Sequence, residues 1–198
     1  MKRSEVAREA ARILYSRNII EYKEAKEIAA ANLGIKLLPS NYEVAIELDR
    51  LAEKIEGSSR YERLIEMRKI ALEIMYTIKK YSPKLIGSVW RGVAREGSDI
   101  DIIAFHDKPN EVQEALFKYN LIKIKDSFFL LDGIPHKSLH LWYQIKNYNA
   151  EIVIHSQEIV KEKCEIFGDE KRGLKIESLE KLIETDPLRR FIPRRRGK

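Results

Sequence analysis

The hydrophobic pattern of the chain changes at Lys84, and this change limits the folds that the chain can adopt. Before Lys84, apolar residues recur every three or four positions, which is typical of amphipathic helices. After it come short apolar runs bounded by Gly, Asp, Asn, Pro or Lys, which is typical of strands. From residue 156 onward the helical pattern returns. The sequence therefore predicts an α+β fold with a helical start, a mixed middle and a helical end.

The predicted helices of the first part have recognisable ends. Gly34 has the position of a C-cap, and Pro83 stops the last of these helices. Ser40 and Glu43 have the spacing of a capping box, in which each side chain satisfies an unpaired backbone N–H, and a box at Ser59 and Glu62 repeats the spacing. The four helices are expected over residues 3–16, 22–33, 41–56 and 60–81.

The pattern of the middle part of the chain predicts short strands and two short helices. The stretch 125–127, Lys-Asp-Ser, is interpreted as a hairpin turn between two of the strands. Helices are expected over residues 89–94 and 109–119. The strands are expected at residues 85–86, 100–105, 121–124, 128–131, 139–145 and 150–154.

The formal net charge of +6 arises at one end of the chain. The rest of the chain has equal numbers of basic and acidic groups. Clustered arginines neutralise phosphates, so this end is a candidate polynucleotide-binding segment, and a disordered, solubilising tail is the alternative. The last ten residues contain no acidic group and six basic ones: Arg189, Arg190, Arg194, Arg195, Arg196 and Lys198.

Several classes of protein are not expected. No apolar run approaches the ~20 residues that span a bilayer, and the charged start lacks the apolar core of a signal peptide. Cys164 is the only cysteine, which excludes an internal disulfide and a multi-cysteine metal site. A cytoplasmic protein without a membrane partner is therefore expected.

The most informative pair of residues is Asp99 and Asp101, at the start of an apolar strand. Residues two apart in a strand face the same side, so the two carboxylates project together. Like charges this close repel unless a cation lies between them, and oxygen-only ligands favour Mg²⁺ or Mn²⁺. The alternative is a strand edge whose acids face solvent.

A glycine and a serine upstream favour the metal interpretation. Gly87-Ser88 ends a strand and opens a helical segment, so free backbone N–H groups and the serine hydroxyl can bind phosphate. Arg91 and Arg95 follow at one-turn intervals and can lean toward a polyphosphate. Glu151, at the start of another apolar strand, would supply a third carboxylate if the two strands are neighbours.

The spacing Gly87-Ser88-x-x-Arg91-Gly92 followed by Ser98-Asp99-Ile100-Asp101 resembles the DNA polymerase β nucleotidyltransferase superfamily, and most closely its minimal nucleotidyltransferases and archaeal CCA-adding enzymes. The helical start also resembles archaeal predicted nucleotidyltransferases. The resemblance implies a small mixed, palm-like sheet backed by helices. It also implies Mg²⁺ or Mn²⁺ on Asp99, Asp101 and Glu151, and a nucleoside triphosphate bound by Gly87, Ser88, Arg91, Arg95 and Ser98.

The resemblance and the hydrophobic pattern together predict three regions: a helical one over 1–57, a catalytic domain over 58–157, and C-terminal helices with the basic tail over 158–198. Three positions depart from the family pattern, and one of them is Val93, where many members have Thr. Trp90 stands where many members have Ala, as a core residue or one that narrows the phosphate loop, and Glu151 replaces the commoner Asp.

Four further side chains are candidates for the site. His136 and His140 have metal-ligand spacing only on a helix, and their neighbours alternate as in a strand, so a zinc pair is not favoured. His140 is instead a possible accessory to the acids from a neighbouring strand, or a hydrogen-bonded core histidine. Trp142 and Tyr143 could stack on a base, and core packing is expected for one of them.

The expected reaction is metal-dependent transfer of a nucleoside monophosphate from NTP to a hydroxyl, with release of pyrophosphate. RNA, at a 3′ end, is the first expected acceptor and partner, because of the arginine-rich end. A protein or small-molecule acceptor is the alternative, as in antitoxin-like or antibiotic-modifying members. The third hypothesis is an RNA-binding module with a vestigial site, against which the set Asp99, Asp101 and Glu151 argues.

Overall fold

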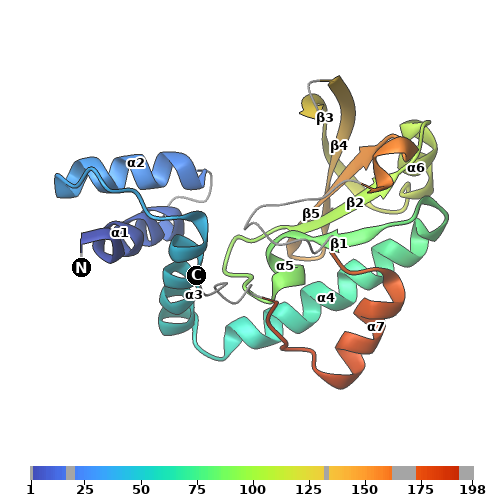
Figure 1. Ribbon diagram of the computed structural model, residues 1–198. Helices are drawn as coiled ribbons and strands as arrows, with labels where there is room; N and C mark the ends of the chain where they lie inside the picture. The colour runs from blue at the N-terminus through green and yellow to red at the C-terminus, as the bar shows by residue number, and fades with distance from the viewer. Residues whose placement is uncertain (1, 17–20, 132–133, 162–172, 192–198) are drawn as a thin grey trace. The chain divides into compact units, whose positions relative to one another are not determined.

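The computed structural model describes residues 2–16, 21–131, 134–161 and 173–191, and the chain divides into two compact units. The first contains the described part of residues 1–60 together with Arg95–Gly97. The second contains Tyr61–Ala94 and the described residues from Ser98 onward. The predicted α+β class is confirmed (Figure 1). The division into three regions at residues 57 and 157 stays a prediction.

The first unit is a small helical core built from α1 (Lys2–Ser16), α2 (Tyr22–Leu33) and α3 (Asn41–Glu56). Gly34 ends α2 in the left-handed region with φ 64°, as predicted. The capping box is also confirmed, because Glu43 donates its backbone N–H to the Ser40 hydroxyl and its carboxylate accepts the Ser40 N–H. The buried stripes meet through alanine, valine and leucine side chains: Val6, Ala7, Ala10, Leu14, Ala25, Ala29, Ala30 and Val44.

The predicted capping box at Ser59 and Glu62 is wrong. Helix α4 (Ser59–Thr77) already includes Ser59, so this residue is in the first turn rather than at the N-cap. Its hydroxyl donates instead to the carbonyl of Glu56 at 2.8 Å. The serine therefore satisfies a backbone acceptor at the C-terminal end of α3. A short 3₁₀ turn, η1 (Lys79–Tyr81), follows α4.

The second unit is organised by a five-stranded mixed sheet in the order β1-β2-β5-β4-β3. The central pair, β2 and β5, is parallel, and every other neighbouring pair is antiparallel. The strands are β1 (Lys84–Ile86), β2 (Ile100–Phe105), β3 (Asn120–Leu131), β4 (Ile134–Ile145) and β5 (Tyr148–His155).

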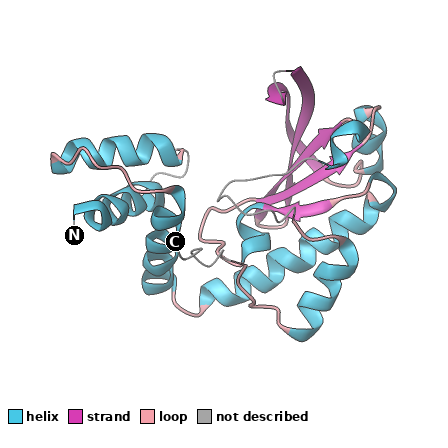
Figure 2. Cartoon of the chain, viewed as in Figure 1, coloured by secondary structure: helices cyan, strands magenta, loops and turns pink. Residues whose placement is uncertain are grey.

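Side-chain alternation along the strands gives the sheet two different faces. One face carries buried apolar residues that pack on α4 and on α7 (Ile176–Thr185), and Figure 2 shows these helices along one side of the sheet. On the central strands its residues are Ile100, Ile102, Ala150 and Ile152. The residues between them, Asp101 and Glu151 included, point to the opposite face, which is called the open face below.

The hairpin turn predicted at Lys125-Asp126-Ser127 is wrong. These residues lie within one continuous strand, β3, and pair with His140, Leu139 and Ser138 of β4. Asp126 forms an ion pair with Lys137 across the two strands, with 3.0 Å between Oδ1 and Nζ. Polar residues here do not mark a turn, because this part of β3 is an exposed edge where charges are tolerated.

The other predicted helices differ from the observed ones in their ends. The segment expected at 89–94 is α5 (Gly87–Arg91), and the one expected at 109–119 is α6 (Pro109–Ala115). The predicted C-terminal helices are represented by the 3₁₀ turn η2 (Gln157–Lys161) and by α7. None of the helices in the described ranges is long and apolar enough to cross a membrane.

Candidate active site

Two pairs of neighbouring strands bring the predicted phosphate loop and two of the predicted acids together. Asp101 pairs with Glu151 across the parallel strands β2 and β5, and with Ile86 across β1. Cross-strand partners share a face, so both carboxylates project from the open face. Gly87 follows Ile86 directly, and Asp99 lies just before β2. The strand neighbourhood on which the three-acid prediction depended is therefore present.

Gly87 lies against the carboxylate of Asp101. A Cβ atom built on Gly87 would overlap the Asp101 side chain, at Oδ2 and Cγ, and the residue has a φ of 68°, in the left-handed region. Glycine is needed here for both reasons, since it has no side chain to collide and adopts positive φ without strain. Gly87 and Asp101, which are fourteen residues apart in the sequence, are thus in direct contact.

The acids perturb one another. Burial raises the pKa of Asp101 to about 7, with further contributions from the charges of Glu151 and Asp99. Burial and the Glu151 charge also raise the pKa of Asp99, while a hydrogen bond from the Asn149 side chain opposes the rise. Crowded, desolvated carboxylates of this kind are typical of functional sites, because a bound cation relieves the repulsion.

Asn149 is a site residue that the sequence analysis did not single out. It could have been identified from its position two residues before Glu151 in a strand, which puts both side chains on one face. Its side chain gives Asp99 a hydrogen-bond donor, which favours the ionised carboxylate.

His140 approaches the acids, as the accessory hypothesis supposed. Its Nδ1 lies 2.6 Å from Oε1 of Glu151, and its Nε2 lies 3.0 Å from the Ser138 hydroxyl. The two contacts fix the imidazole ring and one oxygen of Glu151. Both His136 and His140 lie in β4, so the strand prediction that argued against a zinc pair is confirmed.

The two adjacent aromatic residues of β4 have opposite surroundings. Tyr143 is buried in the core on the helix-covered face, so the prediction that one of the pair packs in the core is confirmed. Trp142 is half-buried on the open face beside Glu151, its strand partner. Its ring stacks on His140 with a centroid distance of 5.7 Å, and the Lys123 ammonium lies 4.7 Å from the ring centroid.

The remaining predicted nucleotide-binding residues have mixed surroundings. Ser88 and Ser98 are half-exposed, beside Gly87 and Asp99 respectively. Arg91 is buried, with its guanidinium 4.5 Å from the Trp90 ring centroid and 3.4 Å from the Phe191 carbonyl oxygen. Trp90 is a core residue, one of the two roles considered for it.

Arg95 belongs to the first unit, where its guanidinium lies 5.9 Å from the ring centroid of Tyr15. The phosphate-binding roles of Arg91 and Arg95 stay predictions. Among the predicted tail residues, Arg189 and Arg190 are described, and Arg189 Cζ lies 5.4 Å from the Phe191 ring centroid. Arg194, Arg195 and Arg196 lie outside the described residues.

A buried arginine that the sequence analysis missed anchors α5 and hence the phosphate loop. Arg68 of α4 is fully buried, and its guanidinium donates to four backbone carbonyls: Val89 at 3.1 Å, Trp90 at 3.0 Å, Pro187 at 2.6 Å and Arg189 at 2.9 Å. Burial lowers its pKa to about 10, so it is charged at neutral pH. The feature of the sequence that could have identified it is its position as a charged residue on the apolar stripe between Leu64 and Ala71.

The donor set has the chemistry of a hard divalent cation, since Asp99, Asp101 and Glu151 offer only oxygen. The charges of Glu151 and Asp99 both contribute to the raised pKa of Asp101. Within the described ranges, no three Asp, Glu, His or Cys side chains already form a cluster that could hold an ion.

Replacing Gly87 by Ala should lower any transfer activity by about 100-fold, because the new methyl group displaces the Asp101 carboxylate. Gly34→Ala is the matched control, since Gly34 has a similar φ of 64° but nothing within 4 Å of the added Cβ. Both variants should lose about 1 kcal/mol of stability through positive φ. Steady-state kinetics and thermal melts would separate the effects, and equal activity in the two variants would contradict the contact.

Asp101→Asn should stabilise the protein more at pH 8 than at pH 4. The pKa of Asp101 is about 7 in the folded state and near 3.8 unfolded, so the native carboxyl keeps a proton that the unfolded chain loses between these values. Stability therefore falls as pH rises through this window, by an amount of the order of 4 kcal/mol. Melting curves at both pH values would test this, and equal gains would contradict it.

The same melting curves, recorded with and without a divalent cation, test whether the acids bind one. Mn²⁺ or Mg²⁺ at pH 8 should raise the melting temperature of the wild type, because the ion stabilises only the native state. Asp101→Asn should lose most of this response. A cation response that survives the substitution would place the ion elsewhere.

Three solved structures similar to the chain are all of Cid1, and the chain spans only about a third of their length. The Cid1 complex with its short product ApU is 20% identical over 46% of this chain and 31% of that chain, with a TM-score of 0.31. The Cid1 poly(U) polymerase with MgGTP bound is 18% identical over 55% of this chain and 38% of that chain, also with a TM-score of 0.31. No curated protein matches the chain.

The sequence also matches a family model, over residues 64–183. This match covers more than half of the chain. It includes Gly87, Ser88 and all three predicted acids, together with the sheet that positions them. The model is that of the nucleotidyltransferase domain, and the chain belongs to this family.

Proposed function

We propose that the chain transfers a nucleoside monophosphate from NTP to the 3′ hydroxyl of an RNA, releasing pyrophosphate. The observation that carries the proposal is the position of Asp101, which lies against Gly87 on one side and beside Glu151 on the other. A phosphate loop and a pair of carboxylates in contact suit a metal-bound triphosphate better than either feature alone.

Asp99, Asp101 and Glu151 would hold Mg²⁺ or Mn²⁺, which supplies charge neutralisation and a lowered acceptor pKa when bound. The Gly87-Ser88 backbone binds the triphosphate. The acceptor oxygen attacks the α-phosphorus, the bond to the bridging oxygen breaks, and pyrophosphate leaves. Glu151 takes the hydroxyl proton, and His140 holds the Glu151 carboxylate in place through its 2.6 Å contact.

The open face supports an RNA acceptor. Trp142 lies beside Glu151 and presents a ring on which a base can stack. Lys123 and Lys125 of β3 lie on the same face, as strand partners of Trp142 and His140, and both are exposed. An aromatic ring next to exposed ammonium groups is the combination that binds single-stranded nucleic acid without sequence preference.

Incubation of the protein with each labelled NTP, Mg²⁺ and either total RNA or total protein tests the acceptor. Label in RNA, and none in RNA whose 3′-terminal diol was destroyed by periodate before the reaction, is the expected result. Label in protein or in a small molecule would overturn the RNA acceptor in favour of the alternative class. Salt-dependent RNA binding without any transfer of label would favour the vestigial module.

The basic end can be tested with a truncation after Phe191. This position spares Arg189, whose carbonyl accepts from Arg68, while it removes Arg194, Arg195 and Arg196. Weaker RNA binding with a flatter salt dependence and unchanged NTP binding is expected. An unchanged salt dependence would leave the end as a solubilising tail.

A further inference from the structure

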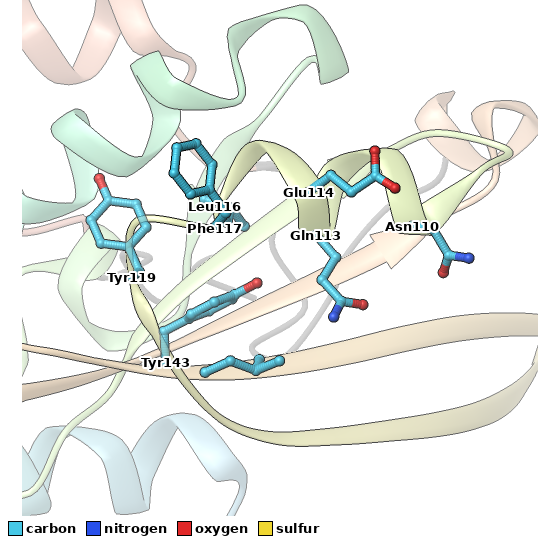
Figure 3. Close-up of a pocket in the computed structure, with 8 residues that line it drawn as sticks. Asn110, Gln113, Glu114, Leu116, Phe117, Tyr119 and Tyr143 are labelled. Carbon is cyan, nitrogen blue, oxygen red and sulfur yellow. The ribbon is translucent and has the colours of Figure 1, made fainter.

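A pocket of 530 Å³ lies beside α6 and strands β3 and β4, apart from the acids (Figure 3). Its volume is in the range of small-molecule sites, ~300–1,000 Å³. Two leucines contribute to its wall, together with Asn110, Gln113, Glu114, Phe117, Tyr119 and Tyr143.

The pocket and the acids lie on opposite faces of the sheet. Trp142 is the strand partner of Glu151, whereas the next residue, Tyr143, is the partner of Ala150 in the buried core. Successive residues of a strand point to opposite faces, so Tyr143 lies on the helix-covered face. A ligand in this pocket would not compete with the triphosphate.

The hydroxyl of Tyr143 is the unusual feature of the pocket. The residue is 1% exposed, and no described group lies within hydrogen-bond distance of its hydroxyl. Burial raises its pKa to about 12, and no charged neighbour contributes. Figure 3 shows this hydroxyl directed toward the α6 side of the pocket, where Gln113 lies. Buried tyrosine hydroxyls normally have a partner, so a ligand that hydrogen-bonds here completes the site.

Tyr119, the second tyrosine of the pocket, has a different role. Its hydroxyl donates to Glu73 at 3.1 Å and lies 3.4 Å from the Thr77 hydroxyl, so it is already paired outside the pocket. Its ring meets that of Tyr143 edge-on, with centroids 6.3 Å apart. The Phe117 side chain at the rim is 86% exposed. Aromatic walls of this kind suit a flat ring.

The lining residues of the pocket do not favour a phosphate group. Among its lining residues there is no Lys or Arg, and Glu114 is the charged one. Asn110 and Gln113, one helical turn apart on α6, offer carboxamides, which pair with the adjacent donor and acceptor of an adenine edge. A carboxylate accepts from an exocyclic amino group.

We infer that the α6 pocket binds the base of a nucleoside or of an unpaired nucleotide, with no phosphate in the pocket and with adenine as the preferred base. The inference does not depend on the proposed transfer reaction. The Tyr143 hydroxyl and the carboxamides bond the edge of the base, while Tyr119 and Phe117 contact its faces.

Titration of the ¹⁵N-labelled protein with adenosine, without divalent cation, tests the inference. The side-chain amide signals of Asn110 and Gln113 should shift, and Tyr143→Phe should weaken binding about tenfold or more. Tyr119→Phe is the matched control and should bind like the wild type, since its hydroxyl already has partners. A trinucleotide of adenosine distinguishes the sources, because it binds more tightly than adenosine only if the pocket takes a base from a polynucleotide.

Equal binding by the wild type and Tyr143→Phe, or no binding of any nucleoside at millimolar concentration, would overturn the inference. A melting temperature of Tyr143→Phe at or above that of the wild type shows that the variant folds. Asp101→Asn separates the two sites, since its adenosine binding should be unchanged. Adenosine binding lost in Asp101→Asn would assign the ligand to the acidic site and would also overturn the inference.

Discussion

Asp101→Asn should lower the rate of nucleotidyl transfer by at least about 10³-fold while the protein stays folded. The substitution removes the carboxylate that lies between Gly87 and Glu151, and with it the charge that the other acids need to hold a cation. Folding should not suffer, because the raised pKa of Asp101 means that its charge opposes the native state at neutral pH. The measurement is single-turnover transfer of labelled nucleotide, with circular dichroism as the test of folding.

The matched control is Asp126→Asn, which removes a carboxylate from the same sheet. Asp126 is exposed and ion-paired with Lys137 on β3 and β4, and surface pairs of this kind contribute little to stability. Its activity should be that of the wild type. Transfer by Asp101→Asn at a rate within tenfold of Asp126→Asn would rule out the metal assignment.

The central part of the fold could be predicted because local signals and long-range pairing agree there. The strands β1 and β2 were predicted from apolar runs bounded by turn residues, and Gly87 and Asp101 from the motif between them. The pairing of Asp101 with Glu151 depended on a strand neighbourhood that one sequence cannot fix. The parallel pairing of β2 with β5 supplies this neighbourhood.

The edge of the sheet could not be predicted in the same way. Lys125 and Asp126 carry charge inside β3, and their polarity resembles that of a turn. An exposed edge strand accepts charges on both faces, so polarity there says nothing about where the chain reverses. The stronger hairpin signal in this stretch is the Asp-Gly pair at 132–133.

The residues that support the site were missed for a different reason. Asn149 and Arg68 belong to no motif, and each acts through a neighbour that only the three-dimensional structure supplies. From the sequence alone, an arginine in a helix is expected to be exposed to solvent. Its burial becomes evident only when its backbone acceptors are known. Arg68 meets carbonyls of Val89 and Pro187, residues that lie far along the chain from it.

Arg68→Met should destabilise the second unit by about 4 kcal/mol. The side chain keeps a similar volume, but four backbone carbonyls lose a charged donor at once, and unsatisfied buried groups cost ~1–3 kcal/mol each. Lys69→Met is the matched control on the same helix, because Lys69 is exposed and its loss should change stability by less than about 0.5 kcal/mol. Denaturant unfolding with comparison of the midpoints at unchanged slope measures both.

Arg68→Lys decides whether the charge or the fork of the guanidinium matters. An ammonium has one nitrogen and cannot reach carbonyls of both α5 and the C-terminal segment, whereas three guanidinium nitrogens share the four acceptors here. Arg68→Lys should therefore lose most of the stability that Arg68→Met loses. Because Arg68 holds Val89 and Trp90 directly after the Gly87-Ser88 loop, the variants should also bind NTP more weakly at temperatures where they remain folded. Stability like that of Lys69→Met in either variant would mean that Arg68 is not what holds α5 in place.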